Sequence, residues 1–319
     1  MALAFTTGTI NQPDAGSVGL AMVEKLRDDV VAHPAWDLVE EFTAASGLVR
    51  WYVFKCLAAQ SGLPADYFVV IERTLGSGEL RTFICEGYTP ATHTASFYAD
   101  IRSTTFSTFD AQGRLPYTYV LGATVLTSPC PSYTTWTPSG TSTKWWLTVD
   151  NDGFTVAFNG ASNGFAHVGA YIPLFSIPNP MPICFIGQDG GTGFAGITRN
   201  PAVAGTTGTV RNSALILTPD SGGGSVGVPL GRVGRLDLGD KAQGDQRPVA
   251  EVGMLLYLAG GAAEVSIQGQ FIGKHKRIRV GATSVPAGIA FGDAYALQGR
   301  LWVPYLPSDT RMWDTGVAV

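Results

Sequence analysis

The sequence predicts a mainly β fold of the α+β class, with antiparallel sheets in sandwich-like domains and one helix near the N-terminus. Three observations support this prediction. Many short segments alternate apolar and polar residues with the period of two that is typical of strands. The chain of 319 residues contains 40 glycines and 19 prolines, which indicate many turns. A single segment, close to the N-terminus, has the apolar spacing of an amphipathic helix.

The predicted helix spans residues 17–31. Ser17 can cap its start, because a serine side chain accepts a hydrogen bond from the backbone N–H groups of the first turn. Pro34 prevents the helix from continuing beyond His33. Asp29 interrupts the apolar stripe, so the pattern is imperfect at this position. The stripe itself repeats every four residues and comprises Val18, Met22, Leu26 and Val30.

Beyond the helix, three segments rich in β-branched and aromatic residues predict an antiparallel meander. Turn-like sequences lie between them, namely residues 60–64, which contain glycine and proline, and residues 76–78, which read Gly-Ser-Gly. The three predicted strands are 48–56, 67–73 and 80–86, and residues 36–42 are a candidate for a further strand beside them.

Residues 144–158 predict a hairpin with paired tryptophans on its first strand. The sequence Asp-Asn-Asp-Gly at 150–153 supplies the reversal, since asparagine and glycine tolerate the positive φ of such turns. Because side chains alternate along a strand, Trp145 and Trp146 must point to opposite faces. We expect one ring to enter the core and the other to meet a second layer, a ligand or a neighbouring subunit. Packing in a core or an interface is favoured over stacking on a sugar.

The rest of the chain predicts strands separated by long loops. Residues 127–143 contain three prolines and many hydroxyl groups and predict a loop, and the four prolines of 173–182 predict an extended crossing or an edge. The glycine- and threonine-rich residues 187–208 predict a long loop at a domain boundary. The further predicted strands are 117–127, 166–172, 252–258, 264–270, 277–280 and 300–305. The expected units are a helix and antiparallel β domain at 1–185, a Gly-rich linker at 186–210 and a β-rich domain at 211–319.

The amino-acid composition limits the classes of molecule that the chain is expected to bind. Charged residues make up 14% of the chain, against about 25% in a typical soluble domain, which favours a subunit whose surface is covered by neighbours. The formal net charge of −4 gives no indication of a nucleic-acid partner. The longest near-continuous apolar run, 252–263, is shorter than the roughly 20 residues that a membrane span needs, so no membrane association is expected. The N-terminus lacks the basic region of a secretory signal.

The cysteines and histidines predict no metal or cofactor. The cysteines form no CxxC pair and are expected to be reduced, buried thiols. The histidines show no spacing typical of a metal site, and each is interpreted as structural or exposed. Two glycine-rich segments, 190–193 and 222–227, lack the lysine of a phosphate-binding loop. The cysteines are Cys56, Cys85, Cys130 and Cys184, and the histidines are His33, His93, His167 and His275.

Two further patterns have a catalytic and a structural interpretation. Residues 160–164 match G-x-S-x-G, which in hydrolases exposes a nucleophilic serine between a strand and a helix. Here a second strand is expected to follow, so a turn between strands is favoured. Asp150 and Asp152 lie close together, as a glycosidase pair must, but aspartates in turns commonly bind backbone N–H groups. We nominate no catalytic residue and expect no small-molecule substrate.

The one basic run, residues 273–280, gives the remaining candidate site. On a strand, Arg277 and Arg279 share a face with His275. We interpret this strand as a contact with an acidic neighbouring subunit, or as a solvated sheet edge whose charges discourage unwanted pairing. The predicted interface residues are therefore Trp146, Arg277 and Arg279.

One set of segments has a recognisable order along the chain: 36–42, 49–55, 66–73, 80–88, 144–150, 168–175 and 277–288, with Gly292-Asp293 and 299–302. Together these segments resemble structural proteins of tailed-bacteriophage virions. The resemblance implies a non-enzymatic particle component that contacts other virion proteins and copies of itself, in a virion assembled in the host cytoplasm. It implies the tail or baseplate first, and a neck or head-decorating position second. A carbohydrate-binding or hydrolytic tail module is the alternative.

Overall fold

The computed structural model confirms the mainly β class, with every pair of adjacent strands antiparallel in the part of the chain that it describes. The sandwich-like arrangement stays a prediction. The described residues are 4–63, 65–75, 80–99, 115–121, 134–136, 140–159, 164–173, 183–189, 193–198, 250–253, 255–260, 264–271, 277–280, 285–304, 307 and 312–319.

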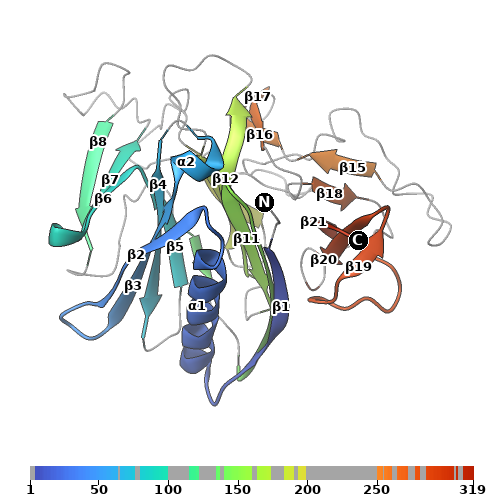
Figure 1. Cartoon of the computed structure of the whole chain (residues 1–319), viewed down its shortest axis with the longest axis horizontal. Helices are drawn as coiled ribbons and strands as arrows, with labels where there is room; N and C mark the ends of the chain where they lie inside the picture. Colours follow the sequence, from blue (N-terminus) through green and yellow to red (C-terminus); the bar gives the residue numbers. More distant parts are fainter. Residues whose placement is uncertain are drawn as a thin grey trace.

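The described strands form four sheets (Figure 1). The hairpin sheet has eight strands: β1 (Ala4–Asn11), β10 (Ser142–Val149), β11 (Gly153–Phe158), β12 (Gly164–Pro173), β13 (Ile183–Asp189) and β14 (Gly193–Thr198) in order, with β17 (Glu264–Phe271) on β12 and β16 (Leu255–Gly260) on β17. The meander sheet has the order β2 (Trp36–Thr43), β3 (Val49–Cys56), β4 (Tyr67–Thr74), β5 (Leu80–Cys85) and β9 (Thr134–Trp136).

Two further sheets lie on either side of these (Figure 1). The C-terminal sheet has the order β15 (Ala250–Gly253), β18 (Arg277–Val280), β21 (Met312–Ala318), β20 (Arg300–Pro304) and β19 (Tyr295–Leu297). The three-stranded sheet comprises β6 (Gly87–Thr89), β7 (Thr94–Ala99) and β8 (Leu115–Val120). The described helices are α1 (Ala15–Val31), the short α2 (Ala58–Ser61) and the 3-10 turn η1 (Pro90–Thr92).

Helix α1 forms as its apolar spacing predicts, but its cap is Asp14 and not Ser17. The carboxylate of Asp14 accepts hydrogen bonds from the backbone N–H of Ser17 at 2.8 Å and from its hydroxyl at 2.9 Å. Aspartate caps a helix as well as serine does, and the backbone is already extended at residue 14. The polar interruption at Asp29 has a partner, because its carboxylate accepts from the hydroxyl of Thr6 on β1 at 2.8 Å.

The main core lies between α1, the meander sheet and the hairpin sheet. The predicted hairpin forms with Trp145 opposite Phe158 and Val149 opposite Phe154. One face of the hairpin packs into this core together with side chains from α1, β3 and β4. A second, smaller core lies on the other face of the meander sheet. It includes Trp51 and Val53 of β3, and Ala95 of β7 in the three-stranded sheet.

The structure contains strands that the sequence patterns did not predict. The N-terminal strand β1 pairs along its whole length with β10. Strand β9 lies within the predicted loop 127–143 and pairs with β5. Strands β13 and β14 form a hairpin that includes residues 187–189 and 193–198 of the predicted loop 187–208. The glycine and threonine content of residues 187–208 does not predict these strands, because pairing with a neighbouring strand outweighs the weak local preferences of the two residue types.

The second half of the chain also departs from the predicted elements. The single strand predicted at 252–258 is divided between β15 of the C-terminal sheet and β16 of the hairpin sheet. Strand β17 pairs with β12, so one sheet joins residues on both sides of the predicted domain boundary at 186–210. Of the crossing predicted at 173–182, Pro173 ends β12, and residues 174–182 lie outside the described part, as does the Gly-rich segment 222–227.

Candidate interaction surface

Trp146, predicted as an interface residue, is a buried contact within the chain. Its side chain is 0% exposed. Its ring stacks on Trp313 of β21 with centroids 6.2 Å apart, and its indole N–H donates to the carbonyl of Pro304 at 3.1 Å. The second layer that meets this ring is therefore the C-terminal sheet of the same polypeptide, and Trp145 on the opposite face is buried in the main core.

The other tryptophans whose side chains the structure describes are also buried within the chain. Six of the seven tryptophans in the sequence are buried, and the side chain of Trp136 lies outside the described part. Among the described residues, the large hydrophobic side chains that are exposed are Leu48 and Val319. The tryptophan side chains that the structure describes therefore pack between layers of the same chain.

Arg277 and Arg279 lie on β18, which is an inner strand and not a sheet edge. β18 pairs with β15 on one side and β21 on the other. The expectation that this basic strand protects a sheet edge is thus wrong, because strands from 24 residues before it and 32 residues after it in sequence cover both of its edges. Arg279 stands directly opposite Glu251 in the register. The side chains of both arginines lie outside the described part, so their contact with another subunit stays a prediction.

The possible nucleophile motif at 160–164 joins two strands. Residues 160–163 are outside the described part, but β11 ends at Phe158 and β12 begins at Gly164. The motif requires a helix after the serine. Strand β12 stands where that helix would begin, and the structural interpretation as a turn is favoured.

The aspartates of the hairpin turn have structural roles. The carboxylate of Asp150 accepts from the backbone N–H of Asp152 at 3.1 Å, as expected for a turn aspartate. The backbone carbonyls of the two residues accept from the indole N–H of Trp36 and the hydroxyl of Tyr67, both at 2.9 Å. These bonds attach the turn to the meander sheet.

The described cysteines are buried, as predicted. Cys56 donates to the carbonyl of Asn151 at 3.5 Å, and burial raises the pKa of its thiol to about 12. Cys85 is also buried. A thiol that stays protonated at neutral pH is a poor nucleophile, so Cys56 is suited to packing. Cys130 and the side chain of Cys184 lie outside the described part.

Within the described residues, no group of three or more His, Cys, Asp or Glu side chains is arranged to hold a metal ion. His33 is 3% exposed and its Nδ1 accepts from the backbone N–H of Ala35 at 3.3 Å. His93 takes part in the Glu40 cluster described below. The side chain of His167 and all of His275 lie outside the described part. No helix that the structure describes is long and apolar enough to cross a membrane.

His33 gives the chain a predicted sensitivity to acid. Burial lowers the pKa of its imidazole below the ordinary value of 6.5. The unfolded chain therefore binds a proton near pH 6.5 that the folded chain does not, and stability falls as the pH drops below that value, by at most about 1.4 kcal/mol per pH unit. Urea unfolding from pH 8 to pH 5 should show this slope. The slope should be smaller in His33→Gln than in the wild type, and equal slopes in the two proteins would contradict the assignment.

Strand β2 is an edge strand of the meander sheet, with one of its sides unpaired among the described strands. It is the terminal strand of the described sheet, paired with β3 on one side. The backbone N–H of Ala44 donates to the carbonyl of Val49 at 2.8 Å. Because bonded and non-bonded pairs alternate in an antiparallel ladder, the N–H and C=O groups of Thr43 point away from β3. We call residues 36–43 the β2 edge.

A β-bulge in β2 determines which face of the sheet each of two neighbouring glutamates occupies. Leu38 lies opposite Phe54 and Glu40 opposite Val53, so Val39 is the extra residue. A bulge turns the residues that follow it to the other face. Glu40 accordingly contacts the three-stranded sheet, and Glu41 contacts α1.

Glu40 joins the three-stranded sheet to the β2 edge. Its carboxylate accepts a hydrogen bond from the hydroxyl of Tyr88, and the Nδ1 of His93 lies 3.1 Å away. The imidazole stacks on Phe42 of β2, with ring centroids 4.0 Å apart. Burial, together with the bond to Glu40, raises the pKa of Tyr88, so its hydroxyl remains a donor. We call Glu40, Phe42, Tyr88 and His93 the Glu40 cluster.

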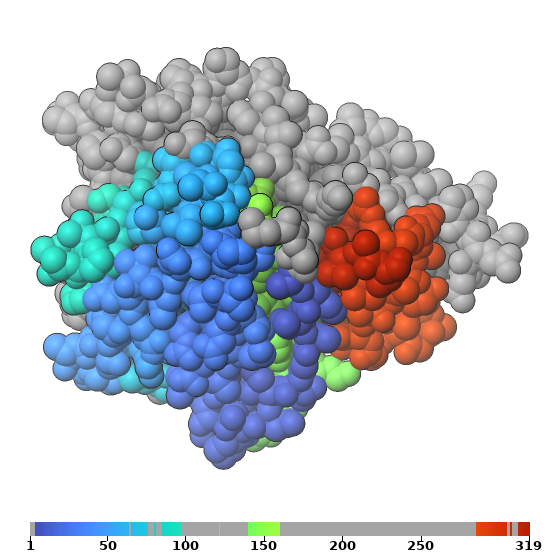
Figure 2. Space-filling model, viewed as in Figure 1, coloured from blue at the N-terminus to red at the C-terminus, as the bar shows by residue number. Residues whose placement is uncertain are grey.

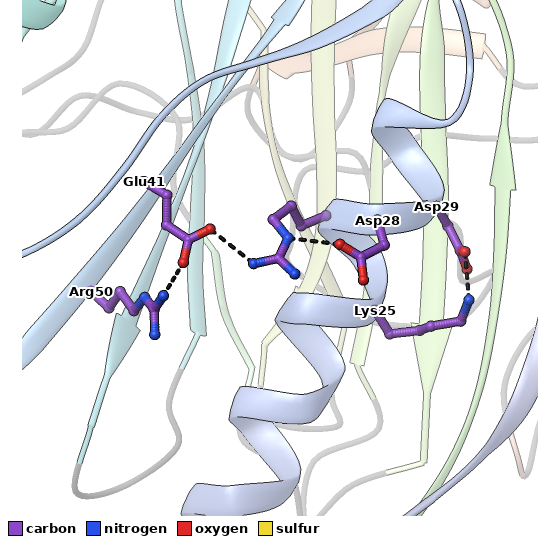
Figure 3. A network of polar contacts seen from close by, with 6 residues as sticks. Lys25, Asp28, Asp29, Glu41 and Arg50 are labelled. Atoms are coloured by element: carbon purple, nitrogen blue, oxygen red, sulfur yellow. Dashed lines mark hydrogen bonds and ion pairs between the residues drawn. The ribbon is translucent and has the colours of Figure 1, made fainter.

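Glu41 joins α1 to the same strand. Figure 3 shows Glu41 and Arg50 beside the helix that carries Lys25, Asp28 and Asp29. The carboxylate of Glu41 pairs with Arg50 and, at 2.9 Å, with Arg27 of α1. Exposed pairs of this kind contribute at most about 1 kcal/mol each, so their main effect is to fix the position of the β2 edge against the helix.

No protein-family model matches the chain, and no curated protein matches it significantly.

Proposed function

We propose that the chain is a non-enzymatic structural component of a tailed-phage virion, positioned in the tail or baseplate, with the neck or head surface as the alternative location. Its role is mechanical, since it holds a fixed place in the particle through contacts between subunits. The resemblance of its segments to virion proteins and its low charge content support this proposal.

The observation that carries the proposal is the open β2 edge. Unpaired backbone groups on a terminal strand bind a strand of another chain, and main-chain hydrogen bonds supply the affinity. The bulge at Val39, the Glu40 cluster and Glu41 hold this strand in place from both faces. A rigid strand loses little conformational entropy when it pairs.

The charges on β2 indicate the kind of strand that would pair with it. Asp37 is exposed, and Glu40 and Glu41 are partly exposed. Two copies of β2 placed side by side would bring these carboxylates together, which is unfavourable. The proposed partner of this edge is therefore a strand with basic side chains from another virion protein, and copies of the chain contact one another elsewhere.

Thr43 allows a test with a matched control. Its outward N–H is the group that a partner strand needs, and its side chain is exposed. Proline at this position removes the donor without removing a bond to β3, whereas Thr43→Val keeps the N–H. We expect Thr43→Pro to reduce co-sedimentation of the chain with tailed particles at least roughly tenfold, as loss of one or two intermolecular hydrogen bonds implies. Thr43→Val should sediment as the wild type does.

Antibody labelling tests the location independently. Antibodies raised against the purified chain should decorate the tail or baseplate of purified particles in electron micrographs. Absence of the chain from the particles would refute the proposed function, whichever strand makes the contact. Labelling combined with equal sedimentation of the two Thr43 variants would refute only the role of the β2 edge.

The alternative, a carbohydrate-binding or hydrolytic tail module, predicted an exposed tryptophan platform. Trp146 is covered by Trp313, so Trp146→Ala would disturb the fold and cannot test glycan binding. A screen of the wild-type chain against host glycans remains the direct measurement. Specific binding by a folded monomer that does not join particles would favour the alternative.

A further inference from the structure

Arg73 is a buried cation beneath the first turn of α1. It lies on β4, directly opposite Arg50 of β3, and its residue exposure is 4%. One terminal nitrogen of its guanidinium donates to the carbonyl of Gly16 at 2.7 Å. Its Nε–H is also buried and has no acceptor. A buried guanidinium normally has every N–H bonded and its charge balanced by an anion.

No described carboxylate balances this charge directly. Glu41 pairs with the neighbouring Arg50, and Asp14 uses both of its oxygens on Ser17. Among the described residues, no carboxylate lies within ion-pair distance of Arg73; Asp14 and Glu24 act on it only from further away. Burial, followed by the repulsion from Arg50, lowers the pKa of Arg73. The positive end of the α1 dipole adds to the excess of positive potential.

Tyr52 places a second unsatisfied donor on the same face of the meander sheet. It is the diagonal neighbour of Arg73 across the β3–β4 pair, and such neighbours are within reach of each other when the side chains are long. Its residue exposure is 0% and its hydroxyl has no partner. Burial raises the pKa of this hydroxyl to about 12, so it remains a neutral O–H donor.

We propose that Arg73 and Tyr52 bind a small inorganic anion, chloride, between the first turn of α1 and strands β3 and β4. The Nε–H of Arg73 can only donate, and the neutral hydroxyl of Tyr52 can donate as well as accept, so an anion satisfies both groups and a cation does not. The burial of Arg73 and Tyr52, and the negative charges of Asp14 and Glu24 that act on Arg73, favour a compact monovalent ion over sulfate or phosphate. The ion would balance Arg73 and so stabilise the attachment of α1 to the meander sheet.

Thermal unfolding at constant ionic strength tests the site, with sodium gluconate replaced stepwise by sodium chloride. A ligand that binds the folded chain raises Tm in a saturable way. The wild type and Arg50→Gln, a control in which the neighbouring arginine is removed, should both show a saturable rise. Arg73→Met should show none. Tyr52→Phe should fold and show the rise with roughly tenfold weaker affinity, because one donor to the ion is lost.

Each outcome decides the proposal. If Arg73→Met does not fold, the shift in half-saturation between the wild type and Tyr52→Phe provides the test. A flat Tm in the wild type would mean that water satisfies these donors, and the proposal would fail. A parallel rise in all variants would show a general salt effect and an adventitious ion only. Saturable stabilisation by sulfate that depends on Arg73 would overturn the assignment to a compact monovalent ion.

Discussion

Replacing Trp146 with alanine should lower the free energy of unfolding by about 3–5 kcal/mol, the range for truncation of a buried tryptophan. The ring is fully buried between the hairpin sheet and the C-terminal sheet. The substitution removes its stacking on Trp313 and leaves the carbonyl of Pro304 without the indole donor. Urea unfolding monitored by circular dichroism measures the change. A loss below about 1 kcal/mol would mean that the ring is exposed and would restore Trp146 as an interface residue.

Trp146→Phe is the matched control, because it keeps an aromatic ring against Trp313 and removes only the indole N–H. We expect it to cost less than half as much as the alanine variant. A double-mutant cycle of Trp146→Leu with Trp313→Leu removes the ring contact, which should be worth about 0.5–1.5 kcal/mol. Additive effects would show that the two layers do not meet at these residues.

The two faces of the hairpin show which structural features the sequence could predict and which it could not. Alternation along a strand is a local property, so the sequence correctly placed Trp145 and Trp146 on opposite faces. What covers each face depends on segments far away in the chain. Trp313 lies 167 residues beyond Trp146 by their numbering, and no pattern around Trp146 indicates it. The second layer was therefore foreseen as a possibility, but its identity was not.

Sheet edges were hard to predict for the same reason. The charges of 273–280 are typical of an edge, yet β18 is an inner strand, because distant segments pair with both of its sides. The open edge of β2 belongs to a segment that the sequence correctly indicated as a candidate strand. Its position at the end of the sheet depends on which strands pair. The buried donors of Arg73 and Tyr52 likewise could not be foreseen, because burial of a polar residue depends on the packing of α1.

Replacing Arg300 with methionine is expected to destabilise the C-terminal sheet by about 3 kcal/mol, since it removes a charged hydrogen-bond donor from a fully buried carboxylate. The carboxylate of Asp314 is fully buried and accepts a hydrogen bond from the partly exposed guanidinium of Arg300. Its other oxygen accepts from the backbone N–H of Gly316 at 2.8 Å. Urea unfolding of the variant, compared with the wild type at the same pH, measures the loss.

The effect should be asymmetric between the two partners. Asp314→Asn leaves the positive charge on Arg300, whose side chain is 28% exposed and can be solvated, so we expect a smaller loss of about 1–2 kcal/mol. The double variant Arg300→Met with Asp314→Leu removes both charges and should recover much of the stability, because an apolar pair often replaces a buried ion pair without loss. If Arg300→Met costs no more than Asp314→Asn, the carboxylate is reached by water, and the C-terminal sheet does not depend on this ion pair.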